Sequence, residues 1–198
     1  MGGMTILATA FTPFGEAKTN VSEDLLLALD DDAGVFRVVL PTEFERAERE
    51  IRRLIRELRP TAVVCFGVAR SAEAVRLERF ARNRDEATSP YNAGEIQQGR
   101  AIVPGAPEVY EATLPYDGIS AALSAKGIPH VFSSDAGGFV CNHTFYCARH
   151  EIEESKRAIS CGFVHVPPIR KPDDFDVLLK AMKICIRISG KAGTAVAV

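Results

Sequence analysis

The fold class is decided by the stretch Ser133-Ser134-Asp135-Ala136-Gly137-Gly138-Phe139-Val140-Cys141-Asn142-His143 and by the segments on either side of it. Residues 129–133, which lead into this stretch, are predicted to form a short strand, and an apolar stripe that begins within it predicts a helix over 141–156. A further strand is predicted over 161–166, in the run Gly162-Phe163-Val164-His165-Val166-Pro167. Strands that alternate with helices are typical of an α/β protein.

The same alternation runs through most of the chain. Apolar runs predict strands over 4–10, 35–40 and 61–66, and helical periodicity predicts helices over 21–29, 44–58, 118–126 and from Asp173 or Asp174 to about Gly190, with a frayed tail beyond. Ser22 is the expected cap of the first helix, and Thr42 with Glu45 forms an expected capping box before the second.

One segment, 72–103, breaks the alternation. Residues 72–83 have weak strand character, and 88–99 contain the prolines and glycines of a loop. The sheet is therefore expected to be mixed. The sequence predicts a three-layer α/β/α sandwich with a mixed, mostly parallel sheet, and a single domain over 1–198.

Composition excludes several classes of function. The chain of 198 residues is 46% hydrophobic and 25% charged, which is ordinary for a globular protein. A net charge of −2 gives no reason to expect nucleic acid or an anionic membrane as a partner. We expect no membrane span, because no apolar run is long enough, and no signal peptide, because the N-terminus lacks a basic region. The oligomeric state stays open, and a homo-oligomer is compatible with the sequence.

The cysteines indicate a reducing compartment. They are odd in number and scattered, and no CxxC pair suggests a redox dithiol or a zinc ribbon. We therefore expect free thiols and a cytoplasmic protein. The five are Cys65, Cys141, Cys147, Cys161 and Cys185.

Cys141 is the candidate nucleophile. It follows a turn of small residues and stands at a predicted helix start, where the helix dipole favours an anionic sulfur. The backbone amides of 140–142 could supply part of an oxyanion hole. The alternative is a buried structural thiol, which is the common state of a cysteine.

His165 is the best candidate for the base. It closes a predicted strand, and ligands of open α/β sheets lie outside the carboxyl ends of strands. His143 and His150 should point away from Cys141 on the helix, and His130 opens a strand. The carboxylate that would orient the base stays open at this point among Glu73, Glu78 and Asp135.

Two aromatic residues, Phe11 and Phe14, lie in the first predicted loop after a strand. They could form an apolar clamp for a flat ligand, or they could fold back onto the core.

Together these blocks resemble the pyrrolidone-carboxylate peptidases (pyroglutamyl peptidase type I), which are cysteine peptidases that remove an N-terminal pyroglutamate. The resemblance extends in family order over nearly the whole chain. The matching blocks are Thr9-Ala10-Phe11-Thr12-Pro13-Phe14-Gly15 with Asn20, Leu77-Glu78-Arg79-Phe80-Ala81-Arg82-Asn83, Ile102-Val103-Pro104-Gly105-Ala106-Pro107 with Thr113-Leu114-Pro115, Ser134 to Asn142, and Gly162 to Pro167.

The resemblance implies a role for each matching residue. Cys141 would be the nucleophile, His165 the base and Glu78 the orienting carboxylate, with no metal and no cofactor. The substrate-binding residues would be Phe11 and Phe14 around the pyroglutamyl ring, Asn20 in support of that loop, and the backbone at Val140. The implied partners are peptides with an N-terminal pyroglutamate.

The chain also departs from the family pattern. Ala10 and Glu16 replace glycines, Val21 a proline and Pro168 a tyrosine, and the block Asp85-Glu86-Ala87-Thr88-Ser89-Pro90 lacks the arginine of the family's Asp-Ala-Arg-Ile-Pro. These departures keep two alternatives open: an enzyme for another small cyclic amide or acyl ester, and a non-catalytic ligand-binding module. A metal site of Cys141, His143 and His165 is disfavoured, because the first two point apart on a helix.

Overall fold

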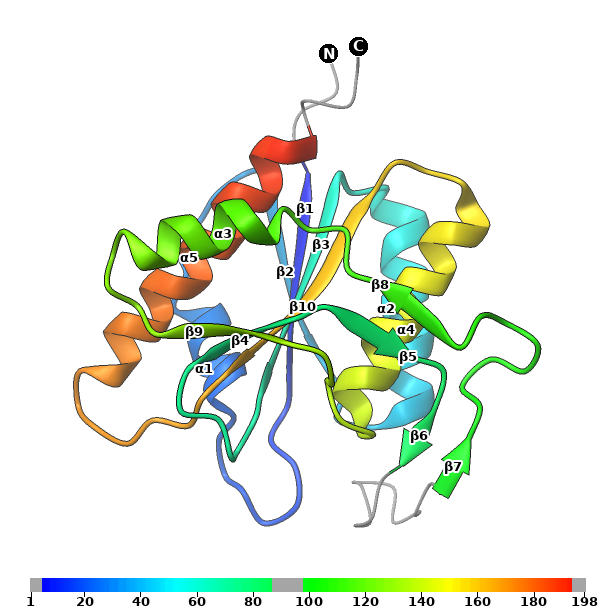
Figure 1. Cartoon of the computed structure of the whole chain (residues 1–198), viewed down its shortest axis with the longest axis horizontal. Coiled ribbons are helices and arrows are strands. Elements are labelled where there is room, and N and C mark those ends of the chain that lie inside the picture. The colour runs from blue at the N-terminus through cyan, green and yellow to red at the C-terminus, as the bar shows by residue number, and fades with distance from the viewer. Residues whose placement is uncertain (1–4, 87–97, 194–198) are drawn as a thin grey trace.

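The computed structural model describes residues 5–86 and 98–193 of the chain. Its centre is a six-stranded sheet in the order β2-β1-β3-β10-β4-β9 (Figure 1). The strands are β1 (Ile6–Phe11), β2 (Val35–Leu40), β3 (Ala62–Val68), β4 (Val75–Glu78), β9 (His130–Ser133) and β10 (Ser160–Val166).

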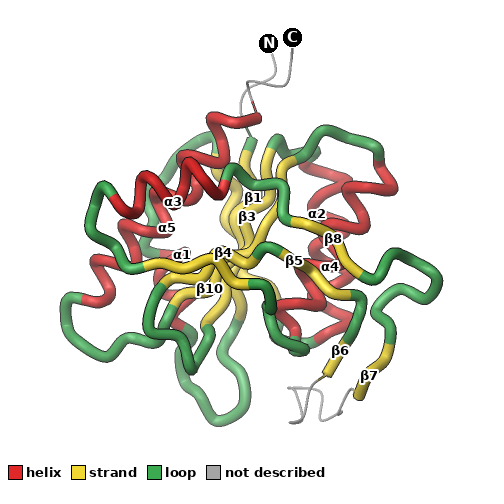
Figure 2. Tube along the Cα trace, in the orientation of Figure 1, coloured by secondary structure: helices red, strands yellow, loops and turns green. Residues whose placement is uncertain are grey.

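Helices cover both faces of this sheet. Figure 2 shows α1, α3 and α5 on one side and α2 and α4 on the other. The helices are α1 (Val21–Leu27), α2 (Phe44–Leu58), α3 (Tyr116–Ser124), α4 (Val140–Ser155) and α5 (Asp174–Gly193). The predicted three-layer α/β/α sandwich is confirmed.

The sheet is mixed, as predicted, and one pairing makes it so. Strands β2, β1, β3 and β10 are mutually parallel, and β4 pairs with β9 in parallel, but β4 lies antiparallel to β10. The segment that breaks the helix–strand alternation therefore contributes β4, the strand that makes the sheet mixed. The rest of that segment forms two small antiparallel ribbons beside α4: β5 (Phe80–Arg82) with β8 (Val109–Glu111), and β6 (Asp85–Glu86) with β7 (Gln98–Arg100).

Two apolar clusters hold the layers together, because alternate residues of each strand face opposite sides. Val64 and Phe66 of β3 join the cluster under α1, α3 and α5, whereas Val63 and Cys65 join the cluster under α2 and α4. Strand β10 divides in the same way, with Phe163 on the α2–α4 side and Val164 on the other. The side chain of His165 thus shares the face of Phe163 and points toward α4.

The helix starts differ from the predicted ones. The cap of α1 is Asn20, whose Oδ1 accepts a hydrogen bond from Ser22 N at 3.0 Å, so Ser22 is not the cap. The residue before α2 is Glu43, without a side-chain cap, and the predicted capping box of Thr42 is absent there. Instead, Thr42 Oγ1 donates to Thr12 O at 2.6 Å and joins the loops after β1 and β2.

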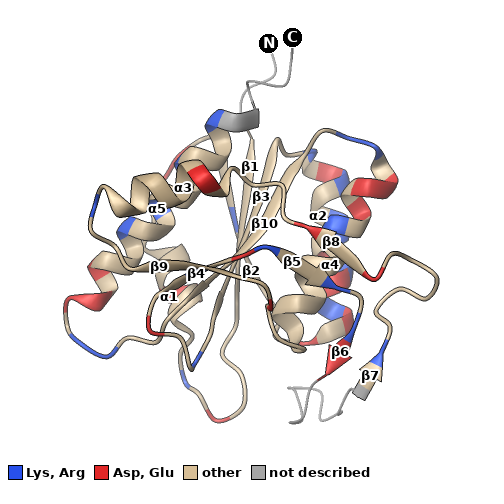
Figure 3. Cartoon of the chain, in the orientation of Figure 1, with Lys and Arg blue, Asp and Glu red and all other residues tan. Residues whose placement is uncertain are grey.

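The predicted loop over 88–99 lies largely outside the described residues, as does the tail after 193, and α5 continues past Gly190. Within the described part of the chain, no helix is both long and apolar enough to span a membrane. Basic and acidic residues alternate along α2 in Figure 3, as expected for a solvated helix face.

Candidate active site

Cys141 lies in the first turn of α4, at the carboxyl end of the parallel strands. The turn before it needs Gly137, whose φ of +81° is left-handed. It also needs Gly138, where a Cβ would lie 2.5 Å from Glu86 Cβ. Cys141 is partly exposed, whereas the other four cysteines, all in described parts of the chain, are buried. It is therefore the thiol that a substrate can reach.

The start of α4 also offers hydrogen-bond donors. The bond from His143 N to Phe139 O, at 3.2 Å, closes the first turn. The N–H groups of Val140, Cys141 and Asn142 come before it and have no carbonyl partner within the helix. They lie beside the Cys141 sulfur at the positive end of the helix dipole, which is where an oxyanion would be stabilised.

His165 and Glu78 meet across the antiparallel pair of β10 and β4. The register places Phe163 opposite Glu78, so Glu78 is the diagonal neighbour of His165 on the same face. His165 Nδ1 lies 2.8 Å from Glu78 Oε1, and both side chains are buried. An ionised carboxylate can only accept, so Nδ1 is the donor and Nε2 is left for Cys141.

The surroundings of His165 favour its protonated form. Burial by itself lowers the pKa of His165, but the charge of Cys141 and hydrogen bonds with Cys141 and Glu78 outweigh it and raise that pKa to about 9. An imidazolium beside the sulfur favours a thiolate, which is the reactive form of cysteine. The arrangement suits nucleophilic catalysis by a thiolate–imidazolium pair.

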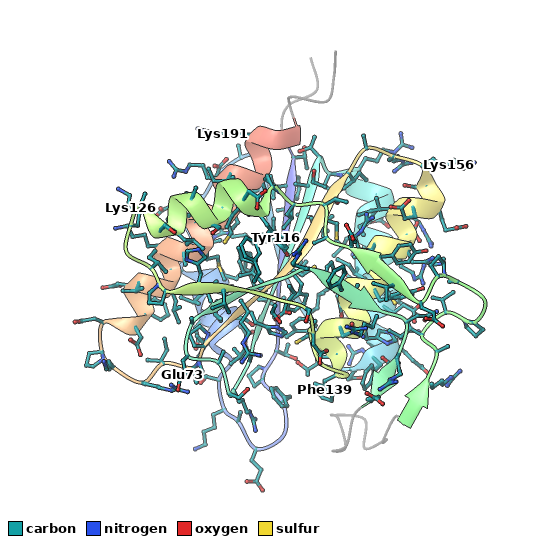
Figure 4. All side chains as sticks on the ribbon, in the orientation of Figure 1. Glu73, Tyr116, Lys126, Phe139, Lys156 and Lys191 are labelled. Carbon is teal, nitrogen blue, oxygen red and sulfur yellow. The ribbon has the colours of Figure 1, made fainter. Side chains whose placement is uncertain are left out.

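Tyr116 joins β10 and β4, the two strands that carry His165 and Glu78. Its hydroxyl accepts from Phe163 N at 3.0 Å and lies 2.8 Å from Phe163 O and 3.1 Å from Glu78 O. Burial raises the pKa of Tyr116 well above its ordinary value, so the hydroxyl keeps its proton. Gly162 makes space for the Tyr116 hydroxyl, since a Cβ at position 162 would lie 2.6 Å from it. Figure 4 shows Tyr116 pointing into the sheet from α3.

Gly67, near the end of β3, leaves space for the Cys141 sulfur. A Cβ at this position would lie 2.9 Å from Cys141 Sγ and 2.9 Å from Phe163 Cζ. The absent side chain therefore lets the sulfur approach the sheet beside His165. Gly67 could not be predicted as a site residue, because nothing in the local sequence distinguishes it from another strand glycine.

A cavity of about 170 Å³ opens in front of Cys141 and His165. This volume is smaller than the roughly 300–1,000 Å³ of pockets for drug-sized ligands, so the cavity suits a small group. Phe11, Phe14, Asn20, Val140, Cys141 and His165 all line it, and Glu78 lies behind His165. The seven residues to which the resemblance assigns a role thus all lie in or directly behind one cavity.

The two phenylalanines occupy different positions in its wall. Phe11 is buried and packs on Phe163, with ring centroids 6.3 Å apart, so it belongs both to the core and to the cavity. Phe14 is half-buried, with its ring centroid 5.6 Å from that of Phe139, which Figure 4 shows at the start of α4. The guanidinium of Arg70 lies 4.5 Å from the Phe14 centroid and covers its face.

Asn20 supports the loop that carries Phe14. Its Nδ2 donates to Thr12 O at 3.1 Å while its Oδ1 caps α1. Thr42 binds the same loop and also lines the cavity, although the sequence predicted only a helix-capping role for it.

The other candidates from the sequence lie elsewhere. Asp135 is exposed and accepts from Gly137 N at 2.9 Å, and Glu73 is exposed on another surface. The remaining histidines have their own partners: His130 with Ser120, His143 with Asp85, and His150 with Tyr110.

Comparisons with known proteins show which family this chain resembles. The pyrrolidone-carboxylate peptidase of Gloeobacter violaceus is 40% identical over 168 residues, which are 83% of this chain and 82% of that protein. The enzyme of the same name from Pyrococcus furiosus is 36% identical over 84% of this chain and 82% of its own length.

Solved structures show the same fold. A mutant pyrrolidone carboxyl peptidase from Pyrococcus furiosus superposes with a TM-score of 0.89 at 32% identity, covering 96% of this chain and 99% of that one. The pyroglutamyl peptidase I of Bacillus amyloliquefaciens gives a TM-score of 0.89 at 30% identity, covering 96% and 98%. The sequence model of the pyroglutamyl peptidase family matches residues 4–190. The chain therefore belongs to the pyroglutamyl peptidase family and is a cysteine peptidase of that type.

Proposed function

We propose that the chain hydrolyses the amide bond after an N-terminal pyroglutamyl residue through a Cys141–His165–Glu78 triad and a thioester intermediate. The observation that carries the proposal is the His165 imidazole, with Nδ1 on Glu78 and its other edge toward the Cys141 sulfur, at the wall of a small apolar cavity. A carboxylate, an imidazole and a thiol in this order are the parts of a cysteine peptidase triad.

The first half of the reaction acylates the enzyme. The Cys141 thiolate attacks the carbonyl carbon of the pyroglutamyl residue, and a C–S bond forms. The negative charge moves to the carbonyl oxygen, which the N–H groups at the start of α4 stabilise. His165 then gives its proton to the departing amine as the C–N bond breaks, while Glu78 keeps the ring oriented.

The second half releases the acid. His165, now neutral, takes a proton from a water molecule, and the resulting hydroxide attacks the thioester carbonyl. The C–S bond breaks, pyroglutamate leaves, and the proton on His165 restores the thiolate–imidazolium pair. No step in this scheme calls on a metal or a cofactor.

The cavity supports the proposed substrate class. Pyroglutamate is a neutral lactam without a free α-amine, so its site needs apolar walls and a few hydrogen bonds rather than an acidic amine-binding group. Phe11, Phe14 and Phe139 supply apolar walls, and Asn20 and Thr42 are polar residues at the same cavity. The implied partners are peptides that begin with pyroglutamate.

The test compares two fluorogenic amides, pyroglutamyl-aminomethylcoumarin and prolyl-aminomethylcoumarin. The prolyl compound keeps the five-membered ring but has a charged amine and no ring carbonyl. We expect cleavage of the pyroglutamyl amide alone. Cys141→Ala should abolish cleavage, and Cys185→Ala, a buried cysteine on the other side of the sheet, should keep it. Cleavage retained by Cys141→Ala would end the nucleophile assignment.

A further inference from the structure

A second cluster of thiol, imidazole and carboxylate lies between α2 and α4. Its members are Glu48, His143 and Cys147, and one potential ligand atom from each lies within 4.8 Å of the others. The two helices pack along each other on one side of the sheet (Figure 1). Among the described residues that line the cavity of Cys141 and His165, none belongs to this cluster.

Asp85 fixes the orientation of the imidazole in this cluster. His143 Nδ1 lies 3.0 Å from Asp85 Oδ1 and 2.9 Å from Asp85 Oδ2, and both side chains are 6% exposed. Because a carboxylate only accepts, Nδ1 carries the proton and Nε2 faces the cluster. A carboxylate that holds one imidazole nitrogen in this way is the usual support of a metal-binding histidine.

The Nε2 atom of His143 is buried, and among the residues that the structure describes none offers it a hydrogen bond of acceptable geometry. Its nearest charged neighbour is Glu48 Oε2, at 3.5 Å. Buried polar atoms without a partner are rare, and each calls for a physical explanation. His143 Nε2 is directed at the carboxylate of Glu48 and lies in a cluster with the thiol of Cys147. Carboxylates and thiols are both metal ligands.

The two helices present these atoms from facing positions. His143 and Cys147 are four residues apart on α4 and so share one face of that helix. Glu48 comes from α2, and its Oε1 accepts from Arg52 Nε at 2.9 Å, which leaves Oε2 for His143. The Glu48 side chain is 29% exposed and gives solvent a route to the buried pair behind it.

We propose that Glu48 Oε2, His143 Nε2 and Cys147 Sγ bind one zinc-like divalent cation between α2 and α4, separate from the catalytic cavity. Sulfur, imidazole nitrogen and carboxylate oxygen are the ligands that Zn²⁺ takes in proteins, and a water molecule would complete four-coordination. Binding releases the thiol proton of Cys147 and any proton on His143 Nε2.

The charges of the cluster balance with the cation present. The thiolate and the Glu48 carboxylate neutralise the dication, while Arg52 and Asp85 carry opposite charges beside it. The cation would join α2 to the helix that carries Cys141, and through Asp85 to β6, so its effect is to stiffen the support of the nucleophile.

The test is a titration with Co²⁺, a spectroscopic substitute for Zn²⁺, in a Cys141→Ala background that removes the catalytic thiol. We expect saturable binding of one equivalent and a sulfur-to-cobalt charge-transfer band in the near ultraviolet. Adding Cys147→Ala should abolish the band. Asp85→Asn should weaken the affinity about 10–100-fold, as loss of an outer carboxylate does at other metal sites. Zn²⁺ should displace Co²⁺ and raise the melting temperature.

Two further variants make the outcome decisive. Cys185→Ala removes another buried thiol and should leave the band unchanged. Glu48→Gln changes the partly exposed ligand, so it should weaken binding while the circular dichroism spectrum stays that of the parent. The proposal is overturned if the folded Cys141→Ala protein shows no thiolate band, or if the same band persists without Cys147.

Discussion

Replacing Gly67 with alanine tests whether the position of the Cys141 sulfur depends on the missing side chain in β3. The new Cβ would lie 2.9 Å from Cys141 Sγ and from Phe163 Cζ, whereas nonbonded carbon contacts settle at about 3.5–4.0 Å. A neighbour must therefore move by roughly 0.6–1.1 Å to restore that contact distance. Phe163 is held between the rings of Phe11 and Phe145, so the sulfur, which can rotate about χ1, should move.

The displaced sulfur should react slowly. A misplacement of about 1 Å costs on the order of 100-fold in rate, or ~2.7 kcal/mol in the activation free energy. Overpacking of a core adds a loss of about 1–3 kcal/mol in the free energy of unfolding. The assay measures kcat/KM on pyroglutamyl-aminomethylcoumarin, together with unfolding in urea.

The matched control is Gly118→Ala in α3, where the new Cβ would lie 3.5 Å from Ile188 Cγ2, an ordinary contact. We expect its kcat/KM to equal that of the parent protein. A folded Gly67→Ala protein with the kcat/KM of the parent would show that the sulfur does not need the space over β3.

Three further predictions concern the residues around the pair. Burial lowers the pKa of His165, but Cys141 and Glu78 raise it to about 9, and the imidazolium is lost as the pH rises through that value. Glu78→Gln should therefore move the alkaline limb of the kcat/KM profile to lower pH, and an unmoved limb would contradict the role of Glu78. Phe14→Ala removes one wall of the cavity and should raise KM about tenfold with little change in kcat; an unchanged KM in initial-rate assays would place the ring outside the binding site. Tyr116→Phe leaves the Phe163 N–H without its partner and should lower the free energy of unfolding in urea by about 1–3 kcal/mol, so a variant as stable as its parent would show that another group binds this N–H.

The fold could be predicted because each element carries its own periodicity. The strand at 161–166 and the helix at 141–156 are each visible in the local sequence, and the break after residue 72 indicated a mixed sheet. The helix caps were harder to predict from the sequence. Asn20 and Ser22 are both good capping residues, and only the path of the chain decides that Asn20 caps α1.

Part of the candidate site could also be read from the sequence. A histidine at the end of a parallel strand and a cysteine at the start of the helix before it were expected at the same edge of the sheet. The orienting carboxylate was not decided by the residues themselves, because Glu78 approaches His165 only through the antiparallel pairing of β4. Gly67 and Tyr116 were not predicted for a similar reason, because their roles arise from contacts between elements far apart in the chain.

The most direct test of the account is the alkylation of the free protein by a limiting amount of iodoacetamide at about pH 6, where an ordinary thiol with a pKa of about 8.5 is almost entirely protonated. Peptide mapping by mass spectrometry identifies the labelled cysteine, and the pyroglutamyl amide assay follows the loss of activity. We predict that Cys141 alone is labelled and that activity falls in proportion to the label. An inert Cys141, or full activity after its complete alkylation, would contradict the claim that its thiolate, paired with His165, performs the reaction.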